Sequence, residues 1–209
     1  LGPSLEDMFQ KCGRKVTVPT VARLAMKMTD LLEELHKHTL NHRDNKPHNF
    51  SVGLRNGEGL KLFDFGLVKK YRNTKFQHIK YREHKNLSGT VRYTSINIHD
   101  GIEPSRRDDM EGMMYVLIYF LRGSLPWQGM RDVDDRDKRH QMIGDLKRRI
   151  PVDALCCGLP AEFAAILRYV RSVKFDNKPD YQYVHRLMTA LLEREGCAPN
   201  VPMDWQQPR

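Results

Sequence analysis

The sequence is poor in cysteine, with four in 209 residues, and none of them stands in a C-x-x-C pair. Cys156 and Cys157 are adjacent, while Cys12 and Cys197 are isolated. This spacing argues against a zinc site or a disulfide framework and favours a reducing intracellular setting. Long apolar runs are also missing. The longest, MMYVLIYFL at 113–121, is about half of what a bilayer requires, so we expect a buried helix there and no membrane span.

Positive charge, in contrast, is abundant. The chain has 35 Lys and Arg against 26 Asp and Glu, which gives a net charge of +9 and a pI near 9.4. This balance favours anionic partners such as phosphate groups, acidic peptides or nucleic acid, without choosing among them. The 209 residues suit one fairly large domain or two small ones. No repeat, low-complexity tract or linker divides the chain, so we interpret it as one unit.

Apolar spacing and capping residues predict a mainly α chain with one small β-hairpin. Ser4 followed by Asp7 is an N-cap pattern, and Gly13 would end the short helix that it opens. Ser105 with Asp108 forms a second capping pattern, directly before the apolar run. FSVGL and LKLFDF, joined by RNGEG, indicate a hairpin with an Asn-Gly turn. Further helices are expected at residues 17–38, 134–149, 160–172 and 181–195.

The stretch NHRDNKPHNF at residues 41–50 concentrates the groups that phosphoryl transfer requires. Such chemistry needs a carboxylate to orient the attacking hydroxyl, a cation beside the transferred phosphate, and oxygen ligands for magnesium. Asp44, Lys46 and Asn49 supply these groups in order, and a DFG triplet adds Asp64 at the end of the hairpin. H-R-D-x-K-x-x-N followed by a hairpin and D-F-G therefore indicates a catalytic loop with a magnesium site.

The residues alone leave two other interpretations of this stretch open. A charged loop after a helix is often only a solvated turn. The histidines at 36, 38, 42 and 48 lie close together in the sequence and could suggest a metal site. However, His36 and His38 would point to different faces of their helix, and no Cys or third His stands at ligand spacing. We expect His42 instead to pack against Phe65.

Five longer stretches resemble one family. They are LGPSLED at the start, KNLSGTVRYTSINIH at 85–99, GIEPSRRDDME at 101–111, GSLPWQG at 123–129 and KFDNKPDYQY at 174–183. On these motifs the chain resembles the C-terminal lobe of a casein kinase 1 family serine/threonine protein kinase over essentially its whole length. Ser-Ile-Asn at 95–97 stands where most protein kinases carry Ala-Pro-Glu, and this replacement is a mark of that family.

The resemblance implies a fold and a set of catalytic roles. The fold would be a protein-kinase-like C-terminal lobe of the α+β class, and the cofactors would be ATP and Mg²⁺. Its parts would be a hinge at 1–3, the catalytic loop at 42–49 and the activation segment at 64–97. Asp44 would be the catalytic base, Lys46 the γ-phosphate contact, and Asn49 with Asp64 the magnesium ligands. Asp109 would cap the catalytic-loop backbone, although a first-turn acid at a helix N-terminus is also a simple interpretation.

The adenine side of the site departs from the family pattern. The resemblance places Leu1 at the hinge position whose backbone holds adenine, and Asp7 where the family approaches the ribose. Ser51 replaces an apolar residue on the floor of the adenine pocket, and Phe63 is bulkier than usual before DFG. The change at Ser51 is expected to weaken nucleotide packing.

The resemblance further implies a substrate class, namely serines or threonines downstream of an acidic or already phosphorylated residue. Residues 67–92 contain eight Lys or Arg against a single acid, which agrees with an anionic substrate. The positions that would bind the upstream phosphate are Lys85, Arg92 and Lys138, helped by backbone at Gln128 and Gly129. The aspartates around Lys138 oppose its role. A solvated face or a nucleic-acid-binding face is the alternative for this basic segment, and nucleic acid is the less favoured partner.

Other departures motivate a second hypothesis, a divergent pseudokinase lobe that acts as a scaffold in a larger cytoskeletal or other assembly. Asn41 and Asn45 stand where the family places aliphatic residues, and buried amides need hydrogen-bond partners. His48 replaces an acid beside Asn49. The Gly-rich loop, the strand-three lysine and its glutamate partner would all belong to an N-terminal lobe that precedes the hinge. Without that lobe, residues 1–209 are expected to be nearly inactive. The family occurs in cytoplasm, nucleus or cytoskeleton, and the sequence does not choose among these.

Overall fold

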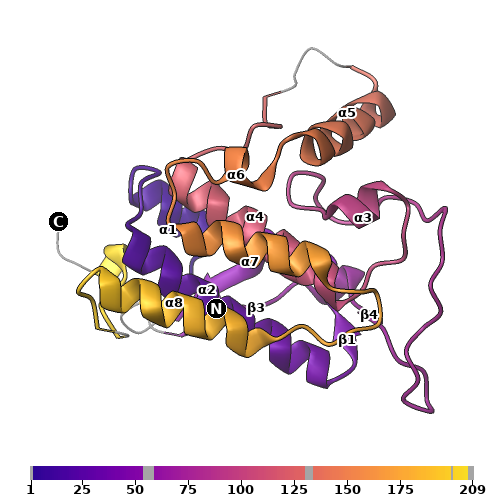
Figure 1. The fold of residues 1–209 in the computed structure, drawn as a ribbon, viewed down its shortest axis with the longest axis horizontal. Helices are drawn as coiled ribbons and strands as arrows, with labels where there is room; N and C mark the ends of the chain where they lie inside the picture. Colours follow the sequence, from indigo (N-terminus) through magenta and orange to yellow (C-terminus); the bar gives the residue numbers. More distant parts are fainter. Residues whose placement is uncertain (1, 54–58, 130–133, 199, 207–209) are drawn as a thin grey trace.

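The computed structural model describes residues 2–53, 59–129, 134–198 and 200–206. Over these residues the chain is mostly helical, with two small antiparallel sheets (Figure 1). The longer helices are α1 (Leu5–Lys11), α2 (Val18–Lys37), α4 (Arg106–Arg122), α5 (Arg136–Arg149), α7 (Ala161–Ser172) and α8 (Tyr181–Arg194). Short helical turns are α3 (Ile96–His99), α6 (Val152–Leu155), η1 (Pro47–Asn49), η2 (Phe65–Leu67) and η3 (Asp204–Gln206). Among the described helices, none has both the length and the apolar character needed to cross a bilayer.

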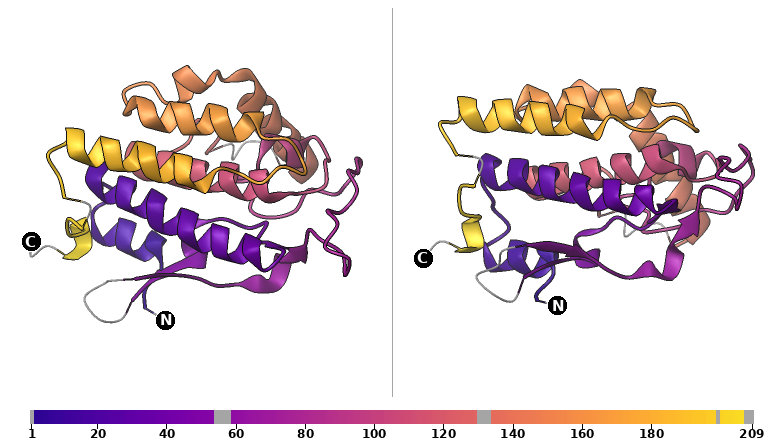
Figure 2. Two further views of the ribbon diagram at one scale, coloured as in Figure 1. Left: turned by 60° about the horizontal axis from the view of Figure 1, so that its bottom comes forward. Right: turned by 90° about the horizontal axis from the view of Figure 1, so that it is seen from below.

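Helix α4 lies at the centre of the hydrophobic core. All its residues from Met110 to Phe120 are buried, so the apolar run forms the buried helix that we predicted. Helix α2 packs against both α4 and α8, and α7 packs against α4 and α8 (Figure 2). These four helices enclose a single core, because each turns its apolar side toward the others. The chain thus forms one unit, and the catalytic-loop segment follows directly after α2.

Local capping chemistry sets the helix starts, as predicted. Ser4 and Asp7 form a complete capping box at the start of α1. Before α4, the Ser105 N–H donates to the Asp108 carboxylate at 2.8 Å, which is one half of such a box. Thr17 caps α2 through its side chain. Helices α5, α7 and α8 begin and end within two residues of their predicted bounds. The short helices α3 and α6 were not predicted, because four residues are too few to show a helical period.

The predicted hairpin is present as two short antiparallel strands. Strand β2 (Phe50–Val52) pairs with β3 (Leu60–Leu62), with Phe50 opposite Leu62. The predicted Asn-Gly turn lies in residues 54–58, outside the described residues. The expectation of one hairpin was incomplete, because β1 (Leu40–Asn41) also pairs with β4 (Lys69–Lys70). This second pairing joins the start of the catalytic loop to the segment after DFG.

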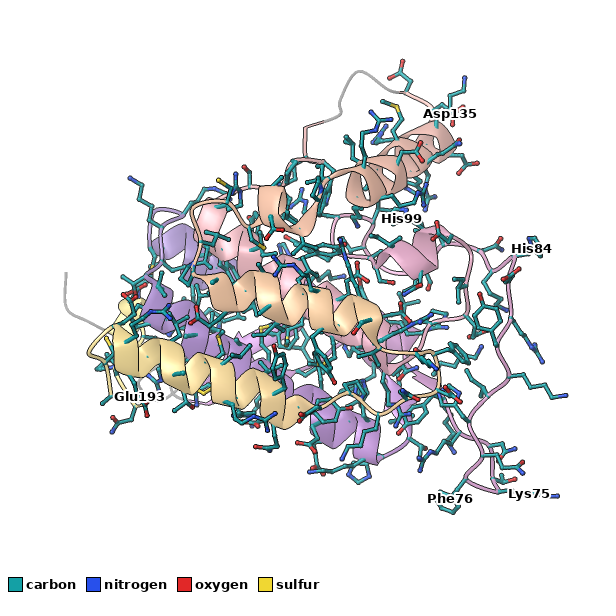
Figure 3. The ribbon with its side chains drawn as sticks, viewed as in Figure 1. Lys75, Phe76, His84, His99, Asp135 and Glu193 are labelled. Carbon is teal, nitrogen blue, oxygen red and sulfur yellow. The ribbon has the colours of Figure 1, made fainter. Side chains whose placement is uncertain are left out.

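Residues 71–95 form a long excursion with little regular structure. Figure 1 shows this segment leaving the body of the helices and returning to α3. Lys75 and Phe76 lie at the tip of one of its loops, and Phe76 is 71% exposed (Figure 3). The segment begins beside the end of α2, where the Tyr71 hydroxyl donates to the His36 carbonyl, and ends beside α4, where Ser95 donates to Asp108.

Candidate active site

Asp44 is held from two directions. Its Oδ1 accepts hydrogen bonds from the backbone N–H of Thr90 at 2.8 Å and from the Thr90 hydroxyl at 2.7 Å. Its Oδ2 accepts from Lys46 Nζ at 2.7 Å and from Asn49 Nδ2 at 3.2 Å. Burial disfavours the charged carboxylate, but the hydrogen bonds from Lys46 and Thr90 outweigh it and lower the pKa of Asp44. Asp44 is therefore ionised at neutral pH, and its hydrogen bonds to Thr90, Lys46 and Asn49 fix the orientation of its carboxylate.

Asn49 and Asp64 lie at the same end of the β2–β3 hairpin. Strand β2 starts directly after Asn49, and its first residue pairs with Leu62, two residues before Asp64. Asp64 has a left-handed backbone, with φ 61°, and its half-exposed carboxylate lies 4.0 Å from Lys46 Nζ. Carboxylate and amide oxygens are the donors that Mg²⁺ prefers. The pair therefore fits a magnesium ion that would also be held by nucleotide phosphates.

The four histidines near the loop do not converge. His36 is buried, whereas His38 is 71% exposed on another face of α2, as predicted. His42 packs edge-on against Phe65, with ring centroids 5.9 Å apart, which confirms the predicted contact. Its Nε2 also donates to the Phe63 carbonyl at 3.1 Å. Within the described residues, no group of three His, Cys, Asp or Glu side chains could hold a metal ion.

Asp109 of α4 holds the backbone of the catalytic loop, as predicted. The N–H groups of His42 and Arg43 each donate to its carboxylate at 2.8 Å, and Asn45 Nδ2 donates at 3.0 Å. His36 Nε2 lies 3.0 Å from Oδ2, the oxygen that also accepts from the His42 N–H. Burial opposes the charge, but the hydrogen bond and charge of His36 and the further donors lower the pKa of Asp109. A single buried carboxylate thus fixes the loop onto the core helix.

The expected adenine side consists of residues that are engaged with one another. Leu1 lies outside the described residues. The Ser51 hydroxyl donates to the Gly2 carbonyl at 2.8 Å, so the polar replacement at this position is satisfied by backbone. The Asp7 carboxylate accepts from the N–H and the hydroxyl of Ser4, at 2.8 and 2.7 Å, and these bonds lower its pKa. Asp7 is ionised and belongs to the α1 cap.

A pocket of about 580 Å³ lies between the activation segment and α5. Its lining residues are Val91, Arg92, Trp127, Gln128, Gly129, Arg139, His140 and Ile143. We call it the Arg92 pocket. It brings together Arg92 with Gln128 and Gly129, as the sequence suggested. Arg139 and His140 were missed, although both follow Lys138 directly, because a run of polar residues does not show which of them faces inward.

The other two residues predicted to bind phosphate lie elsewhere. Lys85 pairs with Glu103 at 3.6 Å, and the same buried carboxylate binds Lys69 at 2.7 Å. Lys138 is 76% exposed and lies 3.9 Å from Asp135, the residue that caps α5. Neither lysine lines the Arg92 pocket. Glu103 was missed because no local pattern shows that a buried acid lies near lysines 18 and 34 residues earlier.

The two unusual asparagines of the loop are buried and only partly satisfied. Asn41 Nδ2 donates to the Pro104 carbonyl at 3.3 Å, and Asn45 Nδ2 donates to the Asp109 carbonyl at 3.1 Å. Among the residues that the structure describes, no donor bonds to the side-chain oxygen of either asparagine. A buried unpaired amide oxygen costs stability. The catalytic loop therefore carries a destabilising feature that an aliphatic side chain would remove.

Asp108 predicts a pH dependence of stability. It is buried and accepts from Ser95 Oγ at 2.6 Å, Asn97 Nδ2 at 3.2 Å and Ser105 N at 2.8 Å. Burial outweighs these bonds and raises its pKa from 3.8 to about 6. The folded state keeps a proton that the unfolded state releases, so this contribution is full below pH 3.8 and is lost as pH rises through 6.

The expected loss from Asp108 amounts to roughly 2 kcal/mol between pH 4 and pH 7. The measurement is urea unfolding of the wild type and Asp108→Asn at half-unit pH steps. As pH rises across this window, the wild type is expected to lose unfolding free energy relative to Asp108→Asn. A difference that stays constant with pH would show that Asp108 titrates normally.

The arrangement matches a known family. A family model described as the protein kinase domain matches residues 2–188, which is most of the chain and includes every catalytic-loop residue discussed above. Protein kinases are transferases that act on protein substrates and in general use ATP and Mg²⁺. The loop, the hairpin and the carboxylate at its end correspond to the parts that such an enzyme requires. This chain belongs to the protein kinase family.

Proposed function

We propose that the protein is a serine/threonine kinase of the casein kinase 1 type, with residues 1–209 forming its C-terminal lobe. The observation that carries this proposal is the convergence of Asp44, Lys46, Asn49 and Asp64 at one end of the β2–β3 hairpin, with Thr90 bonded to Asp44. The hinge would lie at residues 1–3. The protein is proposed to work inside the cell, in cytoplasm, nucleus or cytoskeleton.

We assign one step of the proposed transfer to each of these residues. Asp44 is ionised and would accept the proton of a substrate Ser or Thr hydroxyl while orienting its oxygen. Lys46 lies between the carboxylates of Asp44 and Asp64 and would meet the transferred phosphate there. Asn49 and Asp64 would hold Mg²⁺. When bound, Mg-ATP supplies the γ-phosphoryl group, and the metal neutralises charge on the phosphate oxygens.

Substrate choice is proposed to depend on the Arg92 pocket. The pocket carries Arg92, Arg139 and His140, and acidic side chains are absent from its described lining. Its position beside the activation segment suits an acidic or phosphorylated residue upstream of the acceptor hydroxyl. Charge-assisted hydrogen bonds from Arg to phosphate are strong and geometrically specific. We therefore propose acidic or primed protein segments as substrates.

The first experimental test is transfer of labelled phosphate from Mg-ATP by the full-length protein to two peptides. One carries phosphoserine upstream of the acceptor serine, and the other carries unmodified serine there. We expect the primed peptide to be preferred, and Arg92→Gln to lower the primed-to-unprimed ratio of kcat/KM by about tenfold or more, since such contacts contribute ~1.5–3 kcal/mol.

Two variants control this test. Arg82→Gln removes an exposed cation of the same segment, outside the Arg92 pocket, and is expected to leave the ratio unchanged. Asp64→Asn removes the negative charge of the proposed magnesium ligand and is expected to abolish transfer to both peptides. Absence of transfer by the wild type, together with absence of ATP binding, would instead favour the pseudokinase scaffold. The unpaired amide oxygens of Asn41 and Asn45 motivate this second candidate.

A further inference from the structure

Lys147 is a buried lysine on an otherwise polar helix. Helix α5 buries only Ile143, Gly144 and Lys147, which share one face, and the Lys147 side chain is 0% exposed. Lysines are almost never fully buried unless their amino group is paired. Its neighbours Arg148 and Arg149 follow the ordinary pattern and are not buried. The placement of Lys147 therefore requires specific partners.

Those partners are backbone oxygens of the activation segment. Lys147 Nζ donates to the Val91 carbonyl at 2.7 Å and to the Thr94 carbonyl at 2.6 Å, and lies 3.3 Å from His99 Nε2. Burial lowers the pKa of Lys147 well below its ordinary range and the pKa of His99 to about 3. An ammonium and an amine both supply the two donors that the carbonyls need. The bonds to the segment therefore do not depend on the charge state.

Aromatic side chains complete the enclosure. The Lys147 amino group lies over the rings of Tyr115 and Trp127, 4.9 and 5.2 Å from their centroids. Trp127 Nε1 donates to the Arg92 carbonyl at 2.8 Å. Three carbonyls within the five residues 90–94, those of Val91, Arg92 and Thr94, are thus fixed by side chains from α5 and from the loop after α4.

The fixed segment, which we call the 90–94 turn, carries both functional contacts. At its start, Thr90 gives its N–H and its hydroxyl to Asp44. In its middle, Arg92 lines the Arg92 pocket together with Trp127, and its guanidinium lies over the Tyr93 ring, 5.8 Å from the centroid. Internal bonds from the N–H groups of Tyr93 and Thr94 to the Thr90 carbonyl, at 2.8 and 3.1 Å, keep the turn compact. A shift of this turn would therefore move both Thr90 and Arg92.

We propose that Lys147 is a positioning residue that sets substrate specificity and turnover together. It fixes the 90–94 turn so that Arg92 lines the Arg92 pocket, where it would bind the anion, while Thr90 orients the catalytic carboxylate of Asp44. The proposal rests on the proposed kinase function for its turnover part. The part that concerns Arg92 can be tested by binding alone.

The test compares Lys147→Met with the wild type in the full-length protein. Methionine keeps the length and apolar stem but removes both hydrogen bonds to the turn. We expect kcat on the primed peptide to fall about 10- to 100-fold, since small misplacements of catalytic groups have effects of that size. We expect the primed-to-unprimed ratio to fall by about tenfold as well. Calorimetry is expected to show phosphopeptide affinity reduced by a similar factor.

Two further variants keep the result interpretable. Trp127→Phe keeps an aromatic ring beside Lys147 but removes the bond to the Arg92 carbonyl. It is expected to lower kcat on the primed peptide and the primed-to-unprimed ratio, each by a smaller factor than Lys147→Met. Val170→Ala is a cavity variant in α7, away from the turn, that lowers stability without touching either site. Per folded molecule, it is expected to keep both quantities at the wild-type level.

Specific outcomes would overturn the proposal. One is a Lys147→Met protein with wild-type kcat and a wild-type primed-to-unprimed ratio. Another is a Lys147→Met protein in which only kcat or only the ratio changes. The third is an equal loss of both in Val170→Ala at the same stability. If Lys147→Met does not fold, Trp127→Phe decides by the same criteria. A wild type that transfers no phosphate would defeat the proposed function, whereas unchanged phosphopeptide affinity in Lys147→Met would defeat this inference, so the two failures are distinguishable.

Discussion

Replacement of Asp44 by Asn is expected to lower kcat for phosphoryl transfer by about 10²- to 10⁴-fold, the usual contribution of a general base. The side chain keeps its shape, and its remaining oxygen can still accept both bonds from Thr90. The amide nitrogen would then face two donors, Lys46 Nζ and Asn49 Nδ2. The variant therefore loses the proton acceptor and also releases Lys46 from its partner.

The Asp44 measurement is steady-state transfer from Mg-ATP at saturating peptide, with thermal unfolding alongside. Asp153→Asn serves as the control, because Asp153 is 76% exposed and pairs with Arg168 on the outer face of α7. It is expected to behave as the wild type. A fall in kcat of less than threefold in Asp44→Asn would remove Asp44 from the role of base.

Replacement of Asp109 by Asn is expected to lower the free energy of unfolding by about 3–5 kcal/mol, because it breaks a buried network of charged hydrogen bonds. Each carboxylate oxygen accepts from one backbone N–H of the loop, those of His42 and Arg43. An amide nitrogen in place of either oxygen would oppose a donor. Because His36 Nε2 also lies 3.0 Å from the carboxylate, the amide cannot satisfy every donor in either orientation.

Urea unfolding at pH 7 measures the Asp109 effect, and Asp30→Asn is the matched control. Asp30 is 62% exposed and pairs with His185 on the surface of α8, so its loss is expected to cost under about 1 kcal/mol. The pKa of Asp109 lies below 3.8 in the folded protein, so its contribution is present above that pH and is lost as pH falls further. A difference from wild type that persists undiminished into strong acid would argue for a packing effect.

Much of the fold could be predicted because its determinants are local. The helix starts follow from side chains within three residues, such as Ser4 with Asp7 and Ser105 with Asp108. The β1–β4 pairing could not be predicted, since two-residue strands 28 residues apart show no alternation of their own. Such pairs form because the elements around them bring them together.

The candidate site, too, could be predicted only where its geometry follows from local sequence. The spacing of Asp44, Asn49 and Asp64 around a hairpin is sufficient to place them together, because strand pairing returns the chain to its starting end. Which cations remain available for an anion is not a property of spacing. Lys85 is taken up by the buried carboxylate of Glu103, and Lys138 lies outside the Arg92 pocket. Such pairings depend on tertiary contacts that charge counting does not contain.

The burial of Lys147 also makes it a natural reporter for chemical footprinting. Acylating reagents attack an unprotonated amine that they can reach, and a depressed pKa would favour the unprotonated form of this one. In the structure the buried Lys147 amine is out of reach of the reagent, whereas Lys138 on the same helix is 76% exposed. The rate of Lys147 acylation would therefore report how often α5 separates from the activation segment and exposes this amine. The ratio of the two labelling rates would measure how often α5 separates from the 90–94 turn.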